Sequence, residues 1–275
     1  MSNKEMTKLV INDFKLSSKK EKTSFSPTGY AILNDMEGNP IYEGPNKIVV
    51  AGSAFTASKH INANPPVWTP SYNEVLGLEN SEYVPTVDGV RKGEQIFLFC
   101  VGTGGCGKTP KEVKPVRYDS WIDSDNIVPF KYQPMSHDLN SVERQKYFGR
   151  KVMENNKRVA YYFKKFENKP EIRQQYLDGT PIDENVYTSA RTDEIETFIE
   201  LHLIVTQEDC KEYFDQTVGR EEASLSSISI LTAYETKVNG QVYYQNIRPL
   251  TKYNFPIESL IDSSKGLDIT YFLYY

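Results

Sequence analysis

Apolar and polar residues alternate along much of the chain, and residues 194–206 (EIETFIELHLIVT) show the pattern most clearly. A repeat of two places successive side chains on opposite faces of a β-strand. These 13 residues would span about 43 Å at roughly 3.3 Å per residue, so we expect a bend or a strand that projects beyond its sheet. Phe198 and His202 add bulk to the polar face, which indicates packing on both sides. The first face comprises Ile195, Thr197, Ile199, Leu201, Leu203 and Val205.

Shorter apolar runs predict further strands, and turn residues join two pairs of them into hairpins. Asn239-Gly240 separates residues 225–237 from residues 241–250, and this dipeptide is the strongest short hairpin signal. A second hairpin is predicted around the turn at residues 37–40 (EGNP). Single strands are predicted at residues 9–16, 47–55, 96–101, 127–132, 158–166, 171–177 and 267–275.

Helical patterns are few and short. A single helical turn is predicted at residues 72–76. A helix of about two turns is predicted at residues 141–148, with Asp138 or Asn140 as its cap. Another is predicted at residues 207–214, where Thr206 and Asp209 resemble a capping pair. Residues 256–261 (PIESLI) predict one or two more turns. We therefore expect an α+β fold that is predominantly β, with antiparallel sheets or a β-sandwich, a few short helices and a C-terminal β-α-β-β-α-β unit.

Three regions differ in composition. Residues 1–27 are predicted to form an N-terminal arm and lysine-rich linker, and residues 28–190 a β-rich region with long loops. Residues 191–275 form the C-terminal α+β unit, unless 28–275 is one continuous domain. Residues 62–90 contain several prolines and are predicted to form a long irregular loop. Long loops of this kind usually carry a function or form an interface.

The composition narrows the classes of function. At 275 residues with 19 tyrosines and 13 phenylalanines, the chain can bury a large core, and its aromatic residues suit strands and protein contacts. The net charge of −5 has no basic stripe, so we expect no specific nucleic acid. We find no apolar run near 18 residues and no signal-peptide pattern, so we expect no membrane. Three cysteines without metal spacing favour a reducing compartment.

One segment matches a nucleotide-binding motif. Gly102, Gly107, Lys108 and Thr109 satisfy the phosphate-loop pattern G-x-x-x-x-G-K-T after an apolar run. Such a loop must lead into a helix whose N-terminal amides bind the phosphates. Pro110 follows immediately and Pro115 closes the segment, so we expect a glycine-rich turn without a helix. No buried strand leads directly into the acidic residue that would hold magnesium.

Other candidate sites are weaker still. Asp119, Asp123 and Asp125 resemble the start of a calcium loop that lacks its glycine and final glutamate. His202 and Cys210 could form a nucleophilic pair, but nothing in the sequence orients them. We therefore assign no catalytic, cofactor-binding or metal-binding residues, expect no cofactor, and expect that the protein is not an enzyme.

Several stretches resemble the virion structural proteins of tailed bacteriophages, particularly neck and other ring-forming proteins. They are residues 97–107 (FLFCVGTGGCG), 123–134 (DSDNIVPFKYQP), 160–167 (AYYFKKFE), 178–183 (DGTPID) and 194–275. The resemblance implies a homo-oligomeric ring at the neck, head-to-tail connector or tail, with arms and loops reaching the next subunit. It also implies other virion proteins as partners, assembly in the bacterial cytoplasm and a final place in the virion.

Two alternatives remain open at this stage. The first is a phosphate-loop ATPase or GTPase that uses residues 102–109. The second is a carbohydrate- or receptor-binding β module of a tail fibre or baseplate, with Trp68, Tyr72 or Trp121 as stacking residues.

Overall fold

A computed structural model describes the part of the chain from which the fold can be read. It covers residues 28–61, 71–78, 94–117, 126–134, 136–153, 158–182, 195–259 and 266–275. The predicted strand at 9–16, the residues Trp68 and Trp121, and the three aspartates of the calcium-like segment lie outside these ranges.

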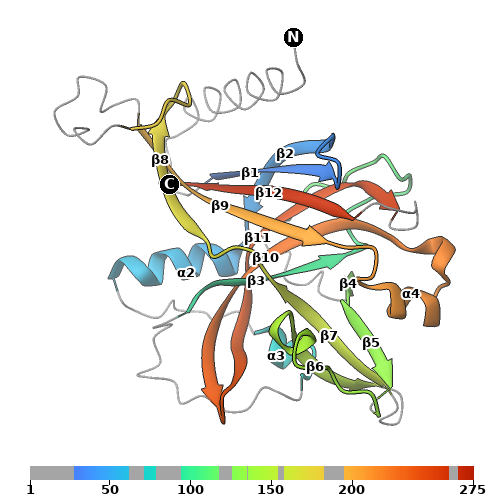
Figure 1. The fold of residues 1–275 in the computed structure, drawn as a ribbon. Coiled ribbons are helices and arrows are strands. Elements are labelled where there is room, and N and C mark those ends of the chain that lie inside the picture. The colour runs from blue at the N-terminus through green and yellow to red at the C-terminus, as the bar shows by residue number, and fades with distance from the viewer. Residues whose placement is uncertain are drawn as a thin grey trace.

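Antiparallel strands dominate the described residues. They are β1 (Thr28–Asp35), β2 (Pro40–Ile48), β3 (Gln95–Gly102), β4 (Ile127–Val128), β5 (Lys131–Pro134), β6 (Tyr147–Met153), β7 (Arg158–Lys165), β8 (Glu171–Tyr176), β9 (Ile195–Val205), β10 (Ser224–Val238), β11 (Gln241–Ser259) and β12 (Leu267–Tyr274). These strands form one sheet in the order β5-β7-β3-β10-β11-β2-β1-β12-β9-β8, with β4 on β3 and β6 on β7 (Figure 1). The predominantly β, α+β fold class is confirmed.

The sheet curls back over itself, and β2 joins its two halves. Lys47 and Ile48 of β2 pair with Lys252 and Thr251 of β11, while the rest of β2 pairs with β1. Figure 1 shows β1, β12 and β9 above β3 and β7. The main core fills the space between the halves, because inward-facing side chains of both are buried together. They include Leu33, Phe99, Leu203, Phe255 and Tyr271.

Strand β3 is buried on both faces. Phe99 and Val101 face the main core, whereas Leu98 and Cys100 face a second core that includes Phe163 of β7. This position explains why the strand is an apolar run without alternation.

The hairpin predicted around Asn239-Gly240 and the strand predicted from the alternating residues 194–206 both form. Asn239 and Gly240 adopt φ angles of 51° and 80°, as the two-residue hairpin turn between β10 and β11 requires. Strand β9 buries Leu201 and Leu203 in the main core. Its other face carries Phe198, whose ring centroid lies 5.6 Å from that of Tyr274. Both faces of β9 are therefore packed, as predicted.

The strand predicted at 47–55 forms only at Lys47 and Ile48, the end of β2, and is wrong beyond them, because the chain turns into helix α2 (Val50–Ile61). The Val49 amide donates to the Leu250 carbonyl, where the pairing of β2 with β11 ends. Gly52 lies so close to the backbone of Leu250 that an added Cβ would overlap it. Small residues thus let the start of α2 pack on β11, and this tertiary contact overrides the β propensity of the two valines.

Helix α3 (Tyr72–Val75) forms where it was predicted, but three other helices differ. Residues 256–261 were predicted helical, yet β11 continues to Ser259, which pairs with Ser224. Only the 3-10 turn η2 (Glu143–Gln145) forms within 141–148, because Tyr147 already begins β6. Helix α4 (Lys211–Gln216) begins late, because the Cys210 amide donates to the Phe130 carbonyl and Cys210 adopts a φ of 64°.

Pro129 divides the strand predicted at 127–132. Strand β4 before it pairs with β3, and β5 after it pairs with β7. Proline has no amide hydrogen for the ladder, which explains the break.

The predicted C-terminal unit lacks its second helix within the described residues and reads β9-α4-η5-β10-β11-β12, where η5 is Arg220–Glu222. Its strands pair outside the unit as well, β10 with β3 and β12 with β1.

Candidate functional site

The glycine-rich segment after β3 folds back on itself. Cys106 and Val113 form an antiparallel bridge, and the Gly107 amide donates to the Glu112 carbonyl at 2.7 Å. The Glu112 amide in turn donates to the Thr109 carbonyl at 3.1 Å. Residues 107–113 therefore form a tight loop in place of a helix, as the prolines predicted.

A carboxylate lies where a phosphate loop would bind its anion. Glu112 Oε2 accepts a hydrogen bond from the Lys108 amide at 3.2 Å, while the Lys108 side chain is exposed. A phosphate cradle needs several free amides converging at a helix N-terminus. Because this loop presents neither, its geometry does not match a phosphate loop despite the matching letters.

The glycines of this loop have a packing role. The Gly105 amide donates to Ser226 Oγ of β10 at 2.9 Å, and a Cβ on Gly105 would overlap the Ser226 carbonyl. A Cβ on Gly102 would likewise lie too close to the Asn126 carbonyl. Glycine is thus required where the loop backbone meets neighbouring backbone.

The three cysteines are buried thiols. Burial raises the pKa of Cys100 to about 12, and it also raises the pKa of Cys106 and Cys210. The Cys106 Sγ donates to the Phe255 carbonyl at 3.2 Å. A high pKa keeps each thiol protonated and therefore weakly nucleophilic.

The remaining candidates from the sequence have structural partners. His202 Nε2 lies 2.8 Å from Glu200 Oε1, a partner other than Cys210. Tyr72 is 3% exposed and stacks on Phe163, so it belongs to the second core. Within the described ranges, no three His, Cys, Asp or Glu side chains gather as metal ligands would.

A buried ion pair that the sequence did not indicate lies under α4. Lys164 Nζ of β7 is 2.8 Å from Asp209 Oδ2, and both side chains are almost fully buried. Asp209 also accepts hydrogen bonds from the Tyr147 hydroxyl and from the amide and hydroxyl of Thr206. Lys164 donates further to the Ile204 carbonyl. This network satisfies both charges, so it is suited to fix structure.

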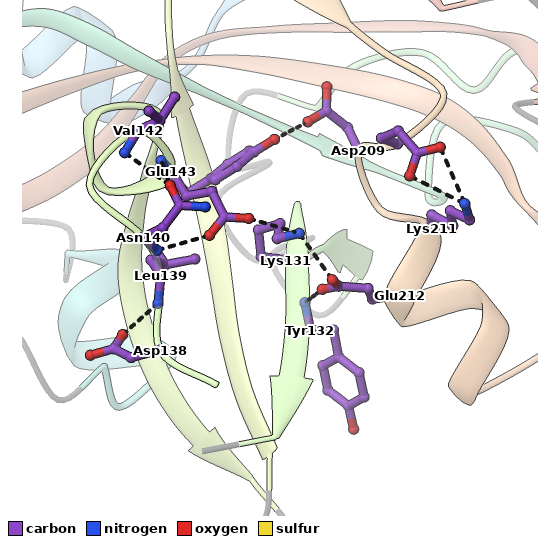
Figure 2. A network of polar contacts seen from close by, with 12 residues as sticks. Lys131, Tyr132, Asp138, Leu139, Asn140, Val142, Glu143, Asp209, Lys211 and Glu212 are labelled. Atoms are coloured by element: carbon purple, nitrogen blue, oxygen red, sulfur yellow. Dashed lines mark hydrogen bonds and ion pairs between the residues drawn. The ribbon is translucent and has the colours of Figure 1, made fainter. Parts of the chain in front are cut away.

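A second, more exposed group of ion pairs lies nearby and is drawn in Figure 2. Lys131 Nζ lies 2.9 Å from Glu212 of α4 and 3.4 Å from Glu143 of η2. Burial alone would lower the pKa of Lys131, but the hydrogen bond and charge of Glu212 raise it above its usual value. Glu212 also accepts from the Tyr132 amide. These contacts join α4 and η2 to β5.

The turn before η2 is also visible in Figure 2. Asn140 Oδ1 accepts hydrogen bonds from the amides of Val142 and Glu143. In turn, the Glu143 carboxylate accepts a hydrogen bond from the Asn140 amide. This reciprocal pattern resembles a capping box, but the residue directly before η2 is Val142, whose side chain makes no capping hydrogen bond, so Asn140 holds the preceding turn and is not the predicted helix cap.

An open surface among the described residues lies beside strand β8. A groove of about 690 Å³ runs between the start of β3, the end of β7 and strands β8 and β9. Ile172 of β8 is 75% exposed at its margin. The apolar lining residues are Ile96, Phe97, Phe166, Pro170, Ile172 and Ile199. An exposed apolar groove rimmed by polar residues is typical of an interaction surface.

Strand β8 is also an edge of the sheet. All six of its residues pair with β9 in one unbroken register. On its other side, the described contacts are at the C-terminal end, where Gln175 bridges Pro181 and Tyr176 bonds to Thr180. Residues Glu171–Tyr176 include no proline and no bulge, and their two charged side chains are Glu171 and Arg173, of which Arg173 pairs with Glu200.

Comparisons with known proteins identify no relative of the chain. No family model matches it, and no curated protein or solved structure shows a significant match. Among the described helices, none is long and apolar enough to cross a membrane.

Proposed function

We propose that the protein is a non-enzymatic structural subunit of a tailed-phage particle that assembles with its own copies into a ring at the neck, head-to-tail connector or tail. The observation that supports assembly most strongly is the open edge of β8 beside an apolar groove. Sheet edges and apolar grooves are the surfaces on which chains add strands and side-chain anchors from a neighbour. The phage context rests on the sequence resemblance.

The interior of the subunit supports a structural role. Several polar groups of the described residues that could serve catalysis or binding have structural partners. Asp209 and Lys164 are buried and paired, and the Lys108 amide binds Glu112. Such fully satisfied networks hold α4 and the glycine-rich loop rigidly against the sheet. A rigid body with an open sheet edge at β8 suits a subunit that repeats around an axis.

The assembly state of the full chain tests the proposal. Size-exclusion chromatography with light scattering, followed by electron microscopy, should give a closed oligomer, either alone or on another virion protein. A chain that stays monomeric at about 100 μM, where even weak protein contacts populate, and binds no virion component would contradict the proposal.

A further inference from the structure

We propose that the edge of β8 and its groove bind residues 9–16 of a neighbouring copy, which add as a strand to the sheet. This inference deepens the proposed ring and rests on it. The segment reads LVINDFKL and is predicted to be a strand. It belongs to the 27 residues that precede the described fold.

The acceptor has the features that strand addition requires. Residues 171–174 of β8 are exposed, and among the described strands they pair only with β9. Two side-chain contacts of this stretch are made toward β9, since Arg173 pairs with Glu200 and Gln174 donates to Thr197. The outer backbone of these residues can therefore offer main-chain hydrogen bonds to an added strand.

The groove supplies specificity for the side chains of that strand. Ile172 pairs with Ile199, so both side chains project from one face of the sheet. This face continues the main core outward, since Ile199 packs against that core. A strand added beyond β8 would place alternate residues above the same groove. In the donor segment, Val10, Phe14 and Leu16 share one face and supply three apolar side chains.

The place where the arm leaves the fold makes the contact reachable. Thr28, Tyr274, Phe198 and Arg173 are successive partners across β1, β12, β9 and β8. Three strand spacings separate Thr28 from β8, or about 14 Å. The 11 residues from 17 to 27 can span about 36 Å when extended, enough to reach across a subunit boundary.

The proposed ring, and not the distance, selects a neighbouring copy over the same chain as the donor. The arm and the edge are different surfaces, so their contact is heterologous. Heterologous contacts close into rings when the rotation between subunits allows it. If the arm occupied the edge of its own chain, this surface would be used up and could not join subunits.

Photo-crosslinking in the full chain tests the contact. The donor carries p-benzoylphenylalanine in place of Phe14, and the acceptor is an isotopically labelled copy without the analogue. After irradiation, mass spectrometry should find the donor joined to labelled peptides that span residues 165–174. Ile172→Arg in the acceptor should reduce this product at least about tenfold, since the charge would enter an apolar groove. Val218→Arg is the matched control and should leave it unchanged, because Val218 is 59% exposed near the end of α4.

The other outcomes separate this inference from the proposed ring. Crosslinks confined to peptides of the donor's own copy would overturn the exchange between neighbours. An oligomer by light scattering without crosslinks at residues 165–174 would overturn the strand addition but leave the ring standing. A monomer without crosslinks would overturn both.

Discussion

The glycine-rich loop and strand β8 differ in what their sequences suggest and in what their surfaces offer. The loop carries the letters of a binding motif, yet it closes on its own Glu112 and packs glycine backbone against Ser226. Strand β8 carries no motif, yet Ile172 stands 75% exposed beside an apolar groove. A local sequence pattern indicates which backbone conformations a segment can adopt. Whether the segment is accessible to a ligand depends on which other residues pack against it in the folded protein.

If Gly105 is a packing residue, Gly105→Ala should cause the largest effect. Its Cβ would overlap the Ser226 carbonyl, so we expect the free energy of unfolding to fall by about 3 kcal/mol in denaturant titrations. Gly38→Ala is the control, because Gly38 has a φ of 83° but open space around it, and should cost about 1 kcal/mol. Equal losses for the two variants would show that the loop is not packed as described.

Thiol labelling compares the two regions directly. Cys106 in the loop is 5% exposed, whereas Ile172→Cys would place a thiol on the exposed edge. With Ellman's reagent on dilute protein at pH 8, we expect Cys106 to react about 100-fold more slowly, because a buried thiol must wait for local opening. Cys100 and Cys210 serve as internal controls for buried thiols. Fast reaction of Cys106 would mean that the loop is open.

Ile172→Arg should separate assembly from stability. We expect self-association to weaken about tenfold in sedimentation experiments, since an exposed apolar contact is replaced by a charge. The free energy of unfolding should stay within about 0.5 kcal/mol, because the side chain is already in water. Val218→Arg should alter neither quantity. Unchanged association of the Ile172 variant would remove β8 from the interface.

Lys108→Ala should have the smallest effect. The Lys108 side chain is exposed, so the free energy of unfolding should change by less than about 0.5 kcal/mol. Calorimetric titration with magnesium and ATP at millimolar concentration should give the same result for wild type and variant. Binding by the wild type that the variant loses would restore the nucleotide-binding alternative.

Local signals predicted the elements whose structure is decided locally. The Asn239-Gly240 turn needs positive φ angles, and alternation over β9 follows from one face packing on the core. The strand predicted at 47–55 ends at Ile48 because contact with Leu250, far away in the sequence, decides where α2 begins. The helix predicted at 256–261 failed for the same kind of reason, since Ser224 pairs with Ser259.

The candidate sites also differ in whether local sequence could predict them. Two prolines were enough to predict that no helix follows Gly107. The Lys164–Asp209 pair could not be predicted, because its members lie 45 residues apart and meet only through folding. A lysine inside the apolar run AYYFKKF was the one available hint. The edge position of β8 also has no local signature, because it depends on the order of strands in the whole sheet.

Amide hydrogen exchange, followed as protein concentration rises through assembly, tests the account most directly because one experiment reports on both regions. We predict that exchange over residues 171–176 slows at least about tenfold on assembly, as new main-chain hydrogen bonds form at the β8 edge. Exchange over residues 103–109 should stay the same. Slower exchange in the glycine-rich loop, with β8 unchanged, would contradict the account.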